Sequence, residues 1–502
     1  MEKIILITFN IISIVLFAIF YKKYLHIYQL KNYQNDRFLK FFLKKYAFLM
    51  IFCIFSFIFL IFCKIFILEI ILNLIFAILY IAISKNIINS SKTPLIKTNK
   101  IKINFAISFI FSIFLSFFCN SLLILFIFSI FMPIISNFLD FYSKIKNKKY
   151  INSAISKLKN CKCKVIAITG SNGKTSTKNI LCKMLSKTYK TQATPASYNT
   201  PLGISKFINQ QLKNDTEFLI LEFGARRKND IKKLCQLFAP DFGIICNISG
   251  QHLETFKSID SVYIAKKELS DYLKTNLCVY NLDNNFCRAM YEIKEGKKIG
   301  ISIEKKSNYC AKNIEIKNFF TEFDMKLGKH IVHARTKLLG HHNVCNIMLA
   351  SVLAIHLGVN INVLPEIIEN LPFIPHRLEY IKGRINILDD SYNCSLASAI
   401  ASINVLKTTK NKTMIVTPGI IEAGKTRYYT NFELGKLLAN SNYCVIVGTE
   451  NKQALTDGIK STNYNLQNLF FATSLEDSKK YYNLLGENDT LLLLNDLPDD
   501  YK

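Results

Sequence analysis

A glycine-rich turn combines the residue types that bind nucleotide phosphates. The apolar stretch 165–168 predicts a strand, and it leads through Thr169-Gly170-Ser171-Asn172-Gly173-Lys174-Thr175 into a predicted helix. In such a turn, backbone N–H groups and the positive end of the helix attract phosphate, the lysine reaches the terminal phosphates and the threonine hydroxyl binds Mg²⁺. A glycine turn alone is also common as an ordinary connection, so the Lys-Thr pair is what favours ATP. The predicted nucleotide-binding residues are Gly170, Ser171, Asn172, Gly173, Lys174, Thr175 and Ser176.

Strands and helices alternate after this turn. Apolar stretches at 218–223, 242–248 and 278–282 predict strands, and their alternation with helical segments indicates a parallel sheet with crossover helices. Functional side chains of such sheets gather where the strands end. Because Glu222 lies at such an end, we expect its carboxylate to be a second Mg²⁺ ligand beside Thr175. His252 also follows a strand, although a single histidine at such a place is more often structural.

The order of these motifs resembles the Mur ligase family, the ATP-dependent amide-bond formers of peptidoglycan synthesis. The common P-loop has a glycine where this chain has Ile168, and the form T-G-S-N-G-K-T is similar to the phosphate loop of that family. Its MurF-type branch, which adds D-alanyl-D-alanine, shows similar motifs at similar intervals. In this chain those motifs are Ser197–Gly203, Leu221–Ala225, Gln251–Phe256 and Ala265–Leu269.

The resemblance implies roles for residues of the central domain. It assigns catalytic roles to Lys174, His252 and Lys266, and Mg²⁺ binding to Thr175, Glu222 and His252. In several family members the lysine that matches Lys266 is carbamylated, which converts a cation into an oxygen ligand for the metals. The neighbouring Lys267 leaves the register of this motif open by one residue, and an unmodified, solvated lysine is the alternative.

Later motifs continue the resemblance. The segment Gly340–Asn346 opens a predicted helix, and the family asparagine matching Asn346 contacts adenine, although asparagines at such a place otherwise cap helices. The family residues matching Arg377 and Asp390 contact the nucleotide, the former through the ATP phosphates. We therefore expect a P-loop-type ATP-binding domain at 150–375 and, since apolar strands alternate with helices after residue 385, a Rossmann-like α/β domain at 376–502.

Residues 1–140 differ in composition from the rest of the chain. Their apolar runs approach the ~20 residues that cross a bilayer, and lysine-rich loops separate them in the pattern of cytoplasmic loops. The net charge of the whole chain is +28, and its excess of lysine is concentrated in the first third, between the apolar runs. This pattern indicates the flanks of membrane segments and not a nucleic-acid partner. We predict an α-helical transmembrane region in the inner (cytoplasmic) membrane, in contact with lipid, with the catalytic domains in the cytoplasm. The predicted spans are residues 4–20, 46–63, 65–83, 103–119 and 121–135.

The family's first domain, which holds the uridine nucleotide of the acceptor, has no recognisable motif here, and the predicted membrane region stands in its place. We expect an ATP- and Mg²⁺-dependent ligase that phosphorylates the terminal carboxylate of UDP-MurNAc-tripeptide and joins it to D-Ala-D-Ala through an acyl phosphate. Other peptidoglycan-precursor enzymes are candidate partners. The alternatives are a membrane-bound ligase of another polymer, such as poly-γ-glutamate, and a non-catalytic scaffold for wall-precursor enzymes.

Overall fold

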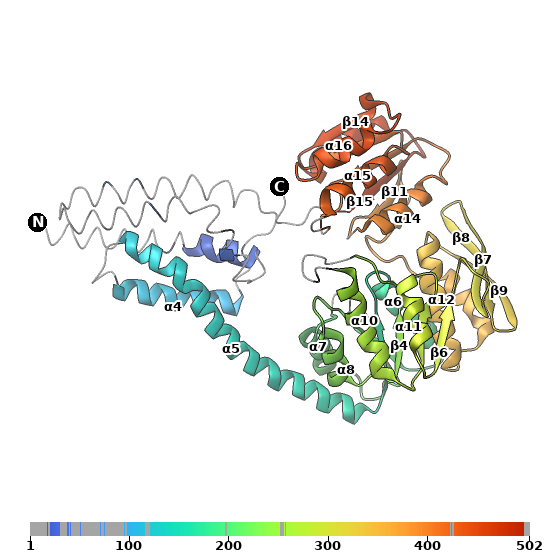
Figure 1. The fold of residues 1–502 in the computed structure, drawn as a ribbon, viewed down its shortest axis with the longest axis horizontal. Helices are drawn as coiled ribbons and strands as arrows, with labels where there is room; N and C mark the ends of the chain where they lie inside the picture. The colour runs from blue at the N-terminus through green and yellow to red at the C-terminus, as the bar shows by residue number, and fades with distance from the viewer. Residues whose placement is uncertain are drawn as a thin grey trace, which may run out of the picture. The chain divides into compact units, whose positions relative to one another are not determined.

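The computed structural model describes most of the chain after residue 97. The described residues are 98–115, 121–195, 198–250, 258–392, 394–421 and 426–495, with Phe256, Ala423 and short pieces before residue 98, of which 21–30 is the longest. The chain divides into two compact units, residues 1–147 with 498–502 and residues 148–497. Figure 1 shows the helices and strands of each unit.

The described part of the first unit is helical. It consists of residues 21–30, α4 (Asn99–Leu115) and the front of α5 (Ser121–Cys161). The Tyr21 hydroxyl donates to Asn104 Oδ1 at 2.5 Å and accepts from the Ser108 hydroxyl at 2.8 Å. The hydroxyls of Tyr28 and Ser136 lie 2.5 Å apart. Buried hydrogen bonds therefore join these helices in addition to apolar contacts.

The described residues contain no helix that is both long enough and apolar enough to span a bilayer. α4 has 17 residues and carries Lys100 and Lys102 in its first turn, so its apolar part falls below the ~20 residues required. The described side chains of α5 include the exposed Lys144 and Lys148. The prediction of a transmembrane region is therefore wrong for the part of the chain that the structure describes.

Two other predictions depended on those helices. The location in the inner membrane and the lipid bilayer as a partner lose their support, because no described helix spans a membrane. Apart from single residues, the predicted spans 4–20, 46–63 and 65–83 lie outside the described residues.

The second unit contains a parallel sheet in the order β2-β3-β1-β4-β5-β6. Its strands are β1 (Lys164–Thr169), β2 (Thr191–Ala193), β3 (Phe218–Glu222), β4 (Phe242–Ile245), β5 (Cys278–Asn281) and β6 (Lys298–Ile301). The strands predicted at 165–168, 218–223, 242–248 and 278–282 are thus present. The predictions missed β2 and β6.

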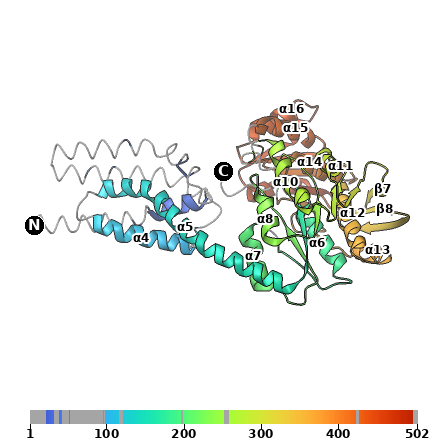
Figure 2. The ribbon, with the colours of Figure 1, turned by 60° about the horizontal axis from the view of Figure 1, so that its bottom comes forward.

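Helices cover both faces of this sheet (Figure 2). Successive side chains of a strand point to opposite faces. Accordingly, Ile166 and Ile168 pack into one apolar cluster, and Val165 and Ala167 pack into another. Burial on both faces explains why β1 reads as a continuous apolar run. The first cluster includes residues of α6 (Lys174–Leu185), α12 (His341–His356) and α13 (Leu364–Glu369), which follows the short helix η1 (Ile361–Val363). The second includes residues of α7 (Pro201–Gln211), α8 (Asp230–Phe238), α10 (Ile259–Leu273), α11 (Asn285–Ile293) and the end of α5.

A three-stranded antiparallel sheet follows β6. Its strands are β7 (Tyr309–Lys317), β8 (Phe320–Leu327) and β9 (His330–Thr336), in the order β7-β8-β9. Alternate residues of β8 are buried, and Phe323, Met325 and Leu327 join the apolar cluster that contains α12. The sheet was not predicted, and it completes the core on the α12 side of the parallel sheet.

The last part of the chain forms a second sheet, in the order β10-β11-β15-β12-β13-β14. All neighbouring strands are parallel except β10, which is antiparallel to β11. The strands are β10 (Glu379–Ile381), β11 (Asn386–Asp390), β12 (Thr413–Thr417), β13 (Tyr443–Val447), β14 (Leu469–Ala472) and β15 (Thr490–Leu494). The helices are α14 (Leu396–Leu406), α15 (Arg427–Leu438), α16 (Lys452–Lys460), α17 (Leu475–Ser478) and the short η3 (Leu466–Asn468) and η4 (Lys479–Leu484). The α/β fold predicted for these two parts of the chain is therefore confirmed, whereas the boundaries at 150–375 and 376–502 stay predictions.

Candidate active site

The turn between β1 and α6 opens into a cavity of about 660 Å³. Gly173 precedes α6 with φ 84°, and no side chain caps the helix. A side chain at Gly173 would be excluded, because a Cβ there would come within 2.5 Å of Asn346 Oδ1. The uncapped N–H groups at a helix start attract anions. The turn therefore has the geometry of a phosphate cradle.

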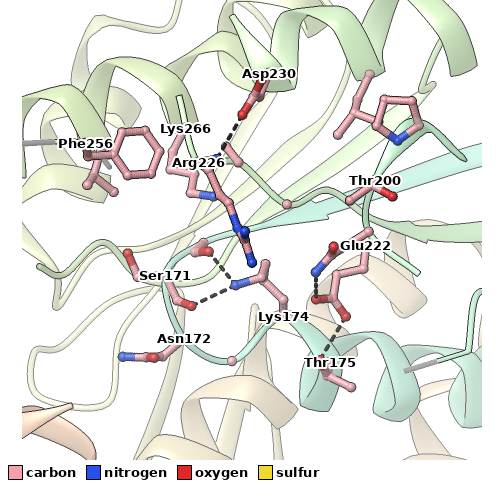
Figure 3. Close-up of a pocket in the computed structure, with 18 of the residues that line it drawn as sticks. Ser171, Asn172, Lys174, Thr175, Thr200, Glu222, Arg226, Asp230, Phe256 and Lys266 are labelled. Carbon is pink, nitrogen blue, oxygen red and sulfur yellow. Dashed lines mark hydrogen bonds between the residues drawn. The ribbon is translucent and has the colours of Figure 1, made fainter. Parts of the chain in front are cut away.

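Most of the predicted site residues meet at this cavity. The predicted residues that line it are Gly170, Ser171, Asn172, Gly173, Lys174, Thr175, Glu222, Lys266 and Arg377. Figure 3 shows the phosphate turn on one side and Lys266 with Phe256 and Arg226 on the other. Ser176, Asn346 and Asp390 are not among the lining residues. His252 lies outside the described residues.

Lys174 is held by its own loop. Its ammonium donates hydrogen bonds to the backbone oxygens of Gly170 at 2.8 Å and Ser171 at 2.7 Å (Figure 3). Burial lowers the pKa of Lys174, and the nearby Glu222 carboxylate partly offsets that effect. Charge-assisted bonds to a phosphate are stronger than bonds to neutral carbonyls, so a bound phosphate would compete effectively for this ammonium.

Thr175 and Glu222 are brought together by strand order. β1 and β3 are neighbours, with Ile168 opposite Glu222, so the end of β3 lies beside the start of α6. The Thr175 hydroxyl donates to Glu222 Oε2 at 2.8 Å, and the Asn199 amide donates to Oε1 at 3.3 Å.

Glu222 has the charge and the neighbours of a magnesium ligand. Burial alone would raise the pKa of Glu222, but the ammonium groups of Lys174 and Lys178 and two hydrogen bonds keep it below its ordinary value. The carboxylate is thus anionic, and with the Thr175 hydroxyl it offers the oxygen ligands that Mg²⁺ prefers. Within the described residues no group of three or more His, Cys, Asp or Glu side chains could hold a metal. The Thr175 hydroxyl and the Glu222 carboxylate fit Mg²⁺, an ion that usually completes its coordination with phosphate oxygens and water.

The structure distinguishes Lys266 from Lys267. Lys266 is 3% exposed and lines the cavity, whereas Lys267 Nζ lies 2.5 Å from Asp271 Oδ1 on the outer side of α10. Burial and then the positive charge of Lys174 lower the pKa of Lys266 to about 7, against the opposing effect of Glu222. A large fraction of Lys266 is therefore a neutral amine near pH 7, and this is the form that reacts with CO₂.

Lys178 was not identified from the sequence. Its side chain is fully buried, its ammonium has no hydrogen-bond partner within the described residues, and Nζ lies 3.6 Å from Glu222 Oε2. Burial lowers the pKa of Lys178, and Glu222 partly offsets the effect. The sequence did contain a signal for Lys178. Residues four apart share a face of a helix, so Lys178 lies on the same side of α6 as Lys174.

Asn346 contacts the start of α6 and does not cap α12, the helix to which it belongs. Gly340 is the N-cap of α12, so the interpretation of Asn346 as a capping residue is wrong. Its buried Oδ1 instead accepts a hydrogen bond from the Thr177 hydroxyl on α6 at 3.2 Å. The adenine contact that the resemblance implies for Asn346 stays a prediction.

Arg377 and Asp390 lie on either side of β10 in the sequence but have different surroundings. The Arg377 guanidinium lies over the Tyr392 ring, 4.4 Å from its centroid, and both residues line the cavity. Asp390 Oδ2 instead accepts a hydrogen bond from the Ser402 hydroxyl on α14 at 2.6 Å. Arg377 is thus placed to meet a bound anion, and the nucleotide contact of Asp390 stays a prediction.

We expect Asp390→Asn to make the protein more stable than the wild type above pH 6 and equally stable near pH 4. Burial raises the pKa of Asp390 from 3.8 to about 6, although the Ser402 hydrogen bond acts against this. A carboxyl group with a raised pKa stabilises the fold below its unfolded pKa, and this contribution is lost as the pH rises through the folded pKa. The thermal midpoint of the variant should exceed that of the wild type by about 2–4 °C at pH 7.5. A constant difference between pH 4 and pH 8 would contradict this account.

Comparison with known proteins agrees with this site. Residues 168–354 match the Mur ligase middle domain. The UDP-N-acetylmuramoyl-tripeptide--D-alanyl-D-alanine ligase of Buchnera aphidicola subsp. Baizongia pistaciae is 31% identical over 284 residues, which cover 55% of this chain and 61% of that protein. The enzyme of the same name from Escherichia coli is 28% identical over 278 residues, covering 54% and 61%. The chain thus matches less than two thirds of the length of these relatives.

Solved structures give the same fold. MurF from Acinetobacter baumannii has a TM-score of 0.63 at 23% identity. The match covers 70% of this chain and 77% of that protein. MurF ligase from Thermotoga maritima, solved in complex with ADP, has a TM-score of 0.64 at 21% identity, with 70% of this chain and 80% of that protein covered. At these identities the likeness concerns the fold.

The fold and the phosphate turn define an α/β protein with a site of the kind that binds nucleotide phosphates. Residues 168–354 match the middle domain of Mur ligases, and the relatives and solved structures to which this chain is similar are of the MurF type.

Proposed function

We propose that this protein is an ATP-dependent ligase that joins D-Ala-D-Ala to UDP-MurNAc-tripeptide through an acyl phosphate, in peptidoglycan precursor synthesis. The observation that carries the proposal is the convergence of Lys174, Thr175, Glu222 and Lys266 on one cavity beside an uncapped helix start. The names of the relatives supply the substrates. Because the matched part spans less than two thirds of those relatives, substrates and activity are proposals for this chain.

The site residues have separable tasks in such a reaction. Lys174 and the N–H groups of α6 would hold the transferred phosphoryl group. Arg377, which lines the same cavity, would stabilise the negative charge of the phosphates during the transfer. Thr175 and Glu222 would hold Mg²⁺, which supplies charge screening between the phosphates and the attacking carboxylate. Lys266 would act near the metal, as an amine or as a carbamate. The amine of D-Ala-D-Ala would then displace phosphate from the acyl phosphate.

An assay with a panel of acceptors tests this function. The purified full chain would be incubated with Mg²⁺-ATP, D-Ala-D-Ala and either UDP-MurNAc-tripeptide, a shorter muropeptide nucleotide or a glutamate oligomer, and the products analysed by mass spectrometry. We expect the pentapeptide product and ADP from the tripeptide nucleotide alone. Extension of the glutamate oligomer would favour a ligase of another polymer. Absence of turnover with every acceptor, despite ATP binding, would favour a non-catalytic scaffold.

A further inference from the structure

Arg226 places a guanidinium on the side of the cavity that faces the phosphate turn. It lies in the loop between β3 and α8 and lines the cavity together with Lys174, Glu222 and Lys266. In Figure 3 its side chain extends from that loop into the cavity, toward Lys174. Sequence reasoning did not select it, because it is one of two adjacent arginines on a polar loop.

The backbone of this loop is fixed while the Arg226 side chain is left available. Asp230 Oδ2, at the start of α8, accepts hydrogen bonds from the N–H groups of Arg226 and Arg227, each at 2.9 Å. Among the described residues, the Arg226 guanidinium makes no hydrogen bond or ion pair, and Arg226 is exposed. Because the backbone of this loop is already held, only the Arg226 side chain has to be ordered when a ligand binds in the cavity.

The charges around Arg226 indicate an anion. The cationic residues that line the cavity are Lys174, Arg226, Lys233, Lys266 and Arg377, and the carboxylates are Glu222 and Asp230. Asp230 is engaged by backbone N–H groups, and Glu222 already faces Thr175, Asn199 and Lys178. Neither carboxylate is therefore left to neutralise Arg226, and an anionic ligand would do so.

We propose that Arg226 binds the carboxylate of the acceptor and orients it toward the terminal phosphate of ATP. This inference rests on the proposed ligase function. The phosphate turn supplies Lys174 and the α6 N–H groups for the nucleotide, whereas Arg226 comes from the facing wall. The planar guanidinium fork matches a carboxylate in a bidentate arrangement, which fixes orientation as well as position. Arg226 would thus select acceptors that carry a carboxylate at the reacting end.

The neighbouring Arg227 provides a matched control. Both arginines are exposed, and both donate a backbone N–H to Asp230, which an alanine substitution keeps. Only Arg226 lines the cavity. A general effect of lost loop charge would therefore appear in both variants, whereas acceptor binding would be lost in one.

The test compares Arg226→Ala, Arg226→Lys and Arg227→Ala in the full chain. We expect Arg226→Ala to raise the KM for UDP-MurNAc-tripeptide by about 10- to 100-fold, the usual range for loss of a hydrogen-bonded charge. The KM for ATP should stay within about twofold of the wild-type value, Arg226→Lys should recover part of the loss, and Arg227→Ala should match the wild type. A rise in the KM for ATP alone would assign Arg226 to the nucleotide and overturn the proposal, as would equal effects at Arg226 and Arg227.

Equilibrium binding separates this proposal from the ligase function. The dissociation constant of UDP-MurNAc-tripeptide would be measured calorimetrically for each protein loaded with Mg²⁺ and a non-hydrolysable ATP analogue. Weaker binding to Arg226→Ala alone supports the role of Arg226 even where the wild type shows no turnover, a result that would count against the function only. Equal binding by wild type and Arg226→Ala, or no binding by the wild type, overturns the role of Arg226.

Discussion

Lys174→Ala is expected to lower ligase turnover by at least about 100-fold while the fold is kept. Lys174 provides an ammonium at the phosphate turn, and loss of a single charge-stabilising donor in an enclosed site costs about this much. Its two hydrogen bonds in this structure go to Gly170 and Ser171 of the same turn, so their loss affects only the loop. The measurement is phosphate release under saturating substrates, with the circular dichroism spectrum as a check of the fold.

Lys183→Ala is the control for this variant. Lys183 lies on the same helix but is exposed, away from the cavity, so the substitution should leave turnover unchanged. Near-normal turnover of Lys174→Ala would remove Lys174 from the site and would contradict ATP binding at this turn.

Lys266→Ala is expected to be strongly impaired and partly rescued by acetate or formate if Lys266 acts as a carbamate. The small acid would enter the space left by the buried side chain and supply the missing oxygen ligands. Because the pKa of Lys266 is lowered to about 7, the neutral amine predominates above that pH. The CO₂ adduct should therefore form increasingly as the pH rises from 6 to 8. Mass spectrometry of bicarbonate-treated protein measures it.

Lys267→Ala provides the matched control for Lys266. Lys267 pairs with Asp271 outside the cavity, so its loss should affect neither turnover nor the adduct. An adduct that persists in Lys266→Ala, or no adduct on the wild type at any pH, would contradict carbamylation of Lys266. The ligase function would survive that result, since an amine could still act near the metal.

The sequence was sufficient to predict the phosphate site because its geometry is local. Strand, turn and helix are consecutive from Lys164 to Leu185, and the motif depends on their order alone. Glu222 was predictable for a related reason: a parallel sheet aligns strand ends at one edge, so a carboxylate at the end of β3 comes close to Thr175 once β3 and β1 are neighbours.

Features that depend on distant packing were not predictable. Arg226 and Arg227 are equivalent in sequence, and only the fold shows which one faces the cavity. The alternating pattern of β8 is readable from Phe320 to Leu327, but its partners become clear only when β7 and β9 are present. The membrane prediction depended on apolar composition, which does not define where helices begin and end. The described helices do not meet the required combination of length and apolar character.

Transfer of oxygen from the acceptor to phosphate tests the central claim most directly. UDP-MurNAc-tripeptide labelled with ¹⁸O in its terminal carboxylate would be incubated with the full chain, Mg²⁺-ATP and D-Ala-D-Ala, and the released phosphate and the nucleotide product analysed by mass spectrometry. An acyl-phosphate route transfers one carboxylate oxygen to phosphate, so we expect one ¹⁸O atom in each phosphate released, together with the pentapeptide product. Phosphate that is released without label, or released equally in the absence of the acceptor, would contradict the proposed ligase mechanism.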